Sequence, residues 1–301
     1  MLAKNSSLKR VIMKNKAFTL IELLVVIAII ALLLSILMPA LKKVKEQGRA
    51  VVCSSNQGQL GKAWFTYAGE NNDLLIDGAP EWVIGNPDGY MSFNDSGLVA
   101  DGRGDITTAC FVSVPQDING NKSNISLEDK IRGFKKGGLW PYYENYKLMN
   151  CPSDKRYRRL PAEPGTATAS NTIGGYRSYS IGAVYSLIPV YYVIGTGEEN
   201  EVVTKYSRIN QPSTKVVWIE EADGHGFNGN TWNMYLNQER WWDPFAIWHY
   251  GNSTFGYADG HADRYKWTCE VMIMMASEQI KNFPCPGSED YQWFKKAYIP
   301  R

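Results

Sequence analysis

The chain has 301 residues, of which 44% are hydrophobic and 21% are charged, and this composition excludes an intrinsically disordered chain. The formal net charge of +2 is unevenly distributed, because the first 16 residues hold five Lys or Arg and no acidic residue. The remainder is mildly acidic, which argues against a protein that binds nucleic acid by neutralising phosphates.

The first predicted element is a membrane-spanning helix. Residues 23–41 are 19 uncharged, mostly aliphatic residues, and a helix of that length, at about 1.5 Å per residue, approaches the thickness of the hydrocarbon layer. The basic residues before this run should stay in the cytoplasm, and the acidic bulk after it should cross the membrane. A cleaved secretory signal looks similar, but residues 35–45 contain no convincing small-x-small cleavage site.

The helix is predicted to continue beyond the membrane, so that it covers residues 18–68. Apolar residues recur at steps of three and four from Leu37 to Tyr67, which is typical of an amphipathic helix. Pro39 should bend the helix or loosen one turn. The predicted division is a segment 1–17 before the helix, an apolar half at 18–41 and an amphipathic half at 42–68.

A single carboxylate, Glu22, lies at the edge of the apolar run. A charge held at membrane depth costs roughly 3 kcal/mol, so this residue needs a physical explanation. Glu22 either lies at the level of the lipid headgroups or meets a positive partner inside a helical assembly. Such a partner could be the free amino terminus of a neighbouring subunit.

Residues 14–28 (KNKAFTLIELLVVIA) resemble the processing and assembly signal of type IV prepilins and type II secretion pseudopilins. The resemblance implies that 1–17 is a leader, and that a prepilin peptidase cuts between Ala17 and Phe18 and methylates Phe18. It also implies that Glu22, then fifth in the mature chain, neutralises the terminal amine of a neighbour. Pro39 matches a common bend in the pilin helix. The chain departs from the family at Ala17, where the family usually has Gly.

Residues 69–301 are predicted to form a globular head. Residues 69–138 are rich in Gly, Asn, Asp and Pro and should consist of loops with short strands. Clearer strand patterns follow, and residues 267–283 could form a helix. The predicted fold class is α+β, with the long amino-terminal helix packed on a β-rich, loop-rich head. The strand patterns lie at 176–181, 190–194, 215–219 and 253–257.

Two identical tetrapeptides, Ala-Asp-Gly-His at 222–225 and 258–261, follow strand-like runs. Asp-Gly favours a tight turn, because glycine readily adopts the positive φ that such turns need. Alternatively, Asp259, His261 and Asp263 could hold a cation such as calcium. We favour the turns, because calcium sites usually collect about six or more oxygen ligands. Beyond such a cation, the sequence indicates no cofactor.

A second resemblance concerns the head. His249 is followed after nine residues by Asp259-Gly260, and this spacing resembles the carboxy-terminal motif, at 249–261, of a group of bacterial prepilin-like proteins. Residues 151–154 (CPSD) and 53–56 (CSSN) also resemble this group, and the motif brings no established reaction. We expect a hairpin in which His249 bonds a turn carbonyl or the Asp259 carboxylate and locks the register. The motif residues are His249, Asp259, Gly260 and His261.

All five cysteines follow the apolar run, in a compartment that would be oxidising if the head crosses the membrane. Two disulfides and one leftover thiol would fit, but the sequence leaves the pairing open. A bond between Cys53 and Cys151 would tie the amphipathic part of the helix to the head. The cysteines are Cys53, Cys110, Cys151, Cys269 and Cys285.

Aromatic residues cluster at 232–248, where Trp241 and Trp242 are adjacent. They could form an exposed platform that stacks sugar rings or grips a partner. Alternatively they build the core of a domain with few strands. We favour the core, because large aromatic side chains are usually mostly buried.

The leading hypothesis is a non-catalytic, pilin-like structural subunit of a type IV pilus or a type II secretion pseudopilus. The expected partners are a prepilin peptidase, other pilin-like subunits, an assembly platform and the bacterial inner membrane, which the chain would cross once with its head in the periplasm or on a surface filament. The alternative is a membrane-anchored surface protein whose aromatic-rich head binds polysaccharide. A tethered hydrolase that uses Asp223, His225, His249 and Asp259 has no supporting nucleophile, zinc or phosphate-loop motif.

Overall fold

The computed structural model describes residues 19–78, 98–100, 107–113, 115–120, 126–156, 176–185, 202–222, 231–278 and 283–300. The chain divides into two compact units, Met1–Lys45 and Glu46–Arg301. Three predicted features lie outside the described residues: the cleavage site between Ala17 and Phe18, the strand at 190–194, and positions 223–225 of the first repeated tetrapeptide.

Helix α1 (Leu20–Glu70) is 51 residues long, and its ends lie within two residues of the predicted ones. It continues through Pro39 as α-helix, so the proline does not interrupt it. Its most apolar 18-residue window has a mean hydropathy of 3.2 and no buried residue, and the helix is long and apolar enough to cross a membrane. The predicted apolar segment is therefore present as an exposed helix.

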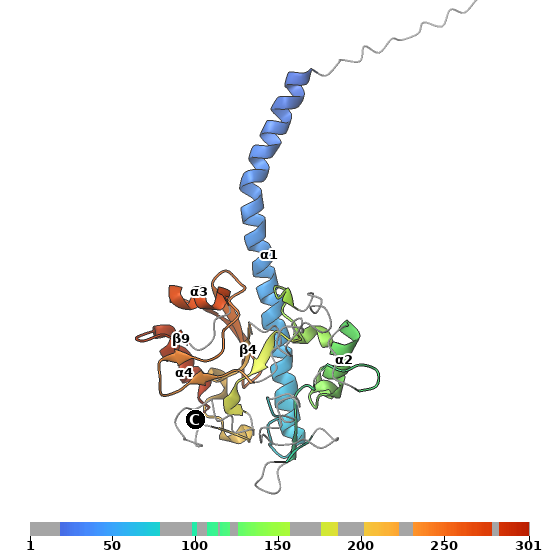
Figure 1. The fold of residues 1–301 in the computed structure, drawn as a ribbon, viewed down its shortest axis with the longest axis vertical. Coiled ribbons are helices and arrows are strands. Elements are labelled where there is room, and N and C mark those ends of the chain that lie inside the picture. Colours follow the sequence, from blue (N-terminus) through green and yellow to red (C-terminus); the bar gives the residue numbers. More distant parts are fainter. Residues whose placement is uncertain are drawn as a thin grey trace, which may run out of the picture. The chain divides into compact units, whose positions relative to one another are not determined.

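The second part of α1 belongs to the head and contributes one face to its core. Cys53, Leu60 and Trp64 are fully buried, whereas Val51 and Phe65 on other faces are exposed. Buried positions recur at steps of three and four, which confirms the amphipathic pattern of this part of the helix. Figure 1 shows this part of α1, in cyan, enclosed by the other elements of the head.

A four-stranded antiparallel sheet forms the centre of the head, with the strand order β3-β4-β7-β8. Strand β4 (Val216–Glu220) is buried along its whole length, as its run of apolar and β-branched residues predicts. The strands predicted at 176–181, 215–219 and 253–257 correspond to β3, β4 and β7. The other strands of this sheet are β3 (Tyr179–Ile181), β7 (Asn252–Tyr257) and β8 (Ala262–Lys266).

The region predicted to be dominated by loops contains a helix that the composition did not reveal. Helix α2 (Leu127–Lys136) begins with a capping box, in which Ser126 and Asp129 each accept a hydrogen bond from the other's backbone N–H. Its neighbours in the chain are, as predicted, short strands, which pair with one another. These are β1 (Leu98–Ala100) and β2 (Thr107–Ala109).

The carboxy-terminal part adds two helices and a small sheet. Helix α3 (Glu270–Glu278) occupies the middle of the predicted helix at 267–283. Helix α4 (Glu289–Tyr298) follows, with Ser288 as its amino-terminal cap. The small sheet has the order β5-β6-β9 and consists of β5 (Met234–Tyr235), β6 (Arg240–Trp241) and β9 (Phe283–Pro284).

The aromatic cluster forms the core of the head between the four-stranded sheet, the small β5-β6-β9 sheet and α4. The ring of Phe245 lies 4.4 Å from that of Trp232, 4.9 Å from that of Trp241 and 4.6 Å from that of Trp267, centroid to centroid. All four side chains are buried. An exposed platform built on Trp232 and Trp241 is therefore wrong, and the core interpretation is confirmed for these residues. Trp242 is half-buried.

Candidate functional site

The start of α1 carries the first candidate site, around Glu22. The backbone N–H and the hydroxyl of Thr19 each donate to Glu22 Oε2 at 2.8 Å, and the Glu22 N–H donates to Thr19 Oγ1 at 3.2 Å. This reciprocal pair is a capping box that satisfies donors at the start of the helix. Glu22 therefore has a local partner within its own chain, which the Thr-x-x-Glu spacing could have revealed.

The other residues predicted for processing and assembly are placed only in part. Ala17 and Phe18 lie just outside the described residues, which begin at Thr19. Their predicted roles therefore stay predictions. Pro39 lies inside the apolar half of α1, among exposed Leu, Ile and Val side chains.

The second candidate site is a buried cluster in the head. Cys53 comes from α1, Cys151 from the loop that follows a short helix, Glu220 from the end of β4, and His249 from the loop before β7. All four side chains are buried, and one potential ligand atom of each lies within 4.8 Å of the others. The sequence pointed to Cys53, Cys151 and His249 separately, and Glu220 was missed although it is the charged residue that ends an apolar strand.

The contacts within this cluster are short. The two Sγ atoms of Cys53 and Cys151 lie 2.6 Å apart, and Cys151 Sγ lies 3.5 Å from His249 Nε2. The same Nε2 lies 3.1 Å from Glu220 Oε1, and His249 Nδ1 lies 3.1 Å from Glu46 Oε1. Both ring nitrogens of His249 thus face a carboxylate, one from the sheet and one from α1.

The surroundings favour the charged form of His249. Burial lowers the pKa of its imidazole, but the hydrogen bonds to Cys151 and Glu220 and the charge of Glu220 outweigh burial and raise the pKa to about 10. For Glu46, burial acts to raise the pKa, but hydrogen bonds from Ser153 and Arg49 lower it overall. At neutral pH we therefore assign an imidazolium between two carboxylates.

The Asp259-Gly260 turn lies at the other end of β7 and meets α1. A Cβ atom built on Gly61 would lie 2.9 Å from Gly260 Cα, so the backbones of the helix and the turn are in direct contact there. Gly260 has a φ of +87°, which favours glycine. This confirms the tight turn at the second tetrapeptide, whose Asp259 Oδ1 accepts from the backbone N–H of His261 at 3.1 Å.

The predicted bond between His249 and the turn is wrong. His249 precedes β7 and the Asp259-Gly260 turn follows it, so the strand separates them, and His249 bonds Glu46 and Glu220 instead. The nine-residue spacing has a different physical role. It places His249 and Gly260 at opposite ends of β7, and each end contacts α1, at Glu46 and at Gly61.

A hydrogen bond lies between these two contacts. The side-chain amide of Gln57, on α1, donates to the carbonyl of Thr254, in β7, at 3.0 Å. Helix α1 therefore lies along β7 over the full length of the motif.

The cation site predicted at Asp259, His261 and Asp263 is not assembled. Asp259 Oδ1 lies 2.5 Å from His261 Nδ1, and Asp263 Oδ1 accepts from the backbone N–H of Arg264. Within the described ranges, the group of His, Cys and carboxylate side chains that could share one ion is the buried cluster of Cys53, Cys151, Glu220 and His249.

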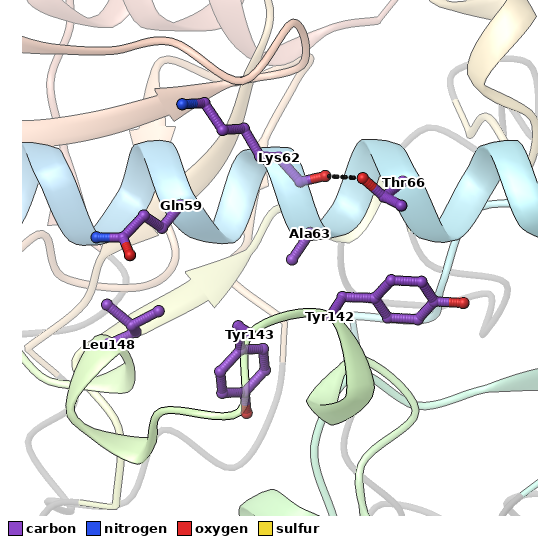
Figure 2. Close-up of a pocket in the computed structure, with 7 residues that line it drawn as sticks. All are labelled: Gln59, Lys62, Ala63, Thr66, Tyr142, Tyr143 and Leu148. Atoms are coloured by element: carbon purple, nitrogen blue, oxygen red, sulfur yellow. Dashed lines mark hydrogen bonds between the residues drawn. The ribbon is translucent and has the colours of Figure 1, made fainter.

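A small pocket opens between α1 and the segment 142–148 (Figure 2). Among the seven described residues that line it, Lys62 alone carries a charge, and Figure 2 shows its amine pointing away from the Tyr143 ring. The Thr66 hydroxyl donates to the Lys62 carbonyl at 2.9 Å and is thereby occupied within the helix. This lining presents no nucleophile beside a base, so the pocket offers no support for hydrolysis.

Comparison with known proteins identifies the amino-terminal segment. Residues 12–38 match the family model described as the prokaryotic N-terminal methylation motif. The amino-terminal segment is of the prepilin type. A prepilin-type segment implies processing by a prepilin peptidase and assembly with other pilin-like subunits. No curated protein and no solved structure matched the chain.

Proposed function

We propose that this chain is a pilin-like structural subunit of a type IV pilus or a type II secretion pseudopilus, without catalytic activity. The peptidase cuts between Ala17 and Phe18 and methylates Phe18, the apolar half of α1 holds the subunit in the inner membrane, and the head lies outside the cytoplasm. The observation that carries the proposal is the methylation motif at residues 12–38, whose residues from Leu20 onward form the beginning of an exposed apolar helix.

The exposed surface of α1 supports assembly through this helix. Large hydrophobic side chains from Leu20 to Leu41 are about half exposed or more. Such a surface is stable only in lipid or against other apolar helices, because apolar area in water costs roughly 25 cal/mol per Å². Lipid covers it before assembly, and the helices of neighbouring subunits cover it in the filament.

Glu22 is the residue that pairs with a neighbouring subunit in the filament. Its carboxylate binds Thr19 through Oε2 in the isolated chain. In a filament, the methylated ammonium of a neighbouring Phe18 approaches this carboxylate, and the charge pair offsets the cost of holding each ion in an apolar bundle.

The processing step is tested by mass spectrometry of the protein purified from cells that contain a prepilin peptidase. The expected product begins at Phe18 and carries one added methyl group. Ala17→Gly should be processed at least as well, whereas Ala17→Glu should keep its leader. An intact leader on the unmodified chain in these cells would contradict the proposal.

The assembly role of Glu22 is separated from its capping role by two variants. Glu22→Gln keeps an oxygen that accepts from Thr19 but removes the charge, while Thr19→Val removes the capping hydroxyl but keeps the charge. The share of protein recovered in sheared filaments should fall strongly for Glu22→Gln and little for Thr19→Val. The opposite order would assign Glu22 to capping alone.

A further inference from the structure

We propose that Cys53 and Cys151 form a disulfide bond that fastens the second part of α1 to the head. Cys53 lies on the buried face of α1, and Cys151 lies 98 positions later, in the loop that follows the short helix Tyr146–Met149. The bond goes beyond the proposed function, and it rests on that function only for the oxidising compartment in which the head lies.

The position of the sulfur atoms favours a covalent pair. Their separation of 2.6 Å is shorter than the roughly 3.5–4 Å that unbonded heavy atoms keep. It is also shorter than the roughly 3.8 Å between two thiolates that share a tetrahedral zinc ion. Both side chains are fully buried and face one another, so neither needs to move far to bond.

The bond forms by thiol–disulfide exchange with an oxidised thiol–disulfide oxidoreductase. The thiolate of one cysteine attacks the enzyme's disulfide and forms a mixed disulfide. The thiolate of the other then attacks the sulfur of the first, so that the Cys53–Cys151 bond forms and the enzyme leaves as a dithiol with both electrons. The two thiol protons pass to the reduced enzyme. Because both sulfurs are buried in the folded head, exchange occurs before α1 is fully packed.

Peptide mapping of the full-length protein tests the bond without any substitution. The protein is purified in detergent, alkylated under denaturing, non-reducing conditions and digested with trypsin. The expected product joins peptide 50–62, which contains Cys53, to peptide 148–155, which contains Cys151, and it disappears after reduction. A link from either cysteine to any other residue would overturn the proposal, as would two alkylated thiols in protein that had also been exposed to an oxidised glutathione buffer.

Two further measurements separate the alternatives. Zinc bound at one ion per chain, together with two alkylated thiols, would overturn the disulfide in favour of the metal site. A link that forms only in the glutathione buffer would support the pairing and instead contradict the outward location of the head. Cys53→Ser should lower the thermal unfolding midpoint by about 10 °C under non-reducing conditions and by much less under reducing ones.

Discussion

The contact between Gly61 of α1 and the Asp259-Gly260 turn can be tested by adding one methyl group. In Gly61→Ala the new Cβ would lie 2.9 Å from Gly260 Cα and 3.5 Å from the Tyr257 carbonyl oxygen. Both neighbours are backbone atoms, so neither can rotate away as a flexible side chain could. Overpacking of this kind costs about 1–3 kcal/mol.

A matched substitution on the same helix isolates that cost. Gly48 lies on an exposed part of α1, and a Cβ added there would meet no atom of the described residues within 4 Å, so Gly48→Ala should only add the helix propensity of alanine. That gain is about 1 kcal/mol and is common to both variants. The two variants should therefore differ in stability by about 1–3 kcal/mol, or roughly 2–12 °C in unfolding midpoint.

The assay is thermal unfolding of the full-length protein in detergent, followed by the near-ultraviolet circular dichroism of its buried tryptophans. We expect Gly48→Ala to unfold at a slightly higher temperature than the unmodified chain, and Gly61→Ala at a lower temperature than Gly48→Ala. If Gly61→Ala is stabilised as much as Gly48→Ala, the helix does not touch the turn, and the role we assign to the nine-residue spacing fails.

Three further predictions concern the head. Phe245→Ala should destabilise it by about 3–5 kcal/mol in chemical denaturation, because it empties the centre of the buried aromatic cluster. Asp290→Ala should cost about 3 kcal/mol in the same assay, because the buried carboxylate accepts from the backbone N–H groups of Thr268 and Cys269, at 2.9 and 2.8 Å. With Cys151 as a thiol, the pKa of His249 is raised from an ordinary 6.5 to about 10, so under reducing conditions its protonation stabilises the fold fully below pH 6.5 and progressively less as the pH rises toward 10. His249→Gln should flatten this decline when the unfolding midpoint is measured against pH, and an unchanged slope would contradict the assignment.

The local features of the chain were predictable from the sequence. Helix α1 was predicted to within two residues because its periodicity extends over many turns and needs no information from the rest of the chain. The buried strand β4 was predictable for a similar reason, since its apolar residues are consecutive. The capping box of Thr19 and Glu22 was equally local, and it was missed because Glu22 was interpreted only through the membrane and a neighbouring subunit.

Apart from the suggested bond between Cys53 and Cys151, the buried cluster was not predictable, because its members are far apart in the chain. Glu46 and His249 are separated by 203 positions, and a single sequence carries no information about which distant residues meet. The error at His249 has a simpler cause. Six residues of β7 extend about 20 Å, so a side chain before the strand cannot reach a carboxylate after it.

The burial of Cys53, Leu60 and Trp64 decides how a water-soluble form of this protein can be made. A truncated protein that begins after Glu70 would lack α1. The apolar core surface that α1 covers would then be exposed, and the protein would aggregate. A truncation shortly before Glu46 would remove the exposed apolar half of α1 and keep the part of the helix that packs into the core of the head. The boundary between the exposed apolar half of α1 and the head therefore lies inside a continuous helix, at the point where its residues begin to be buried, rather than at a loop.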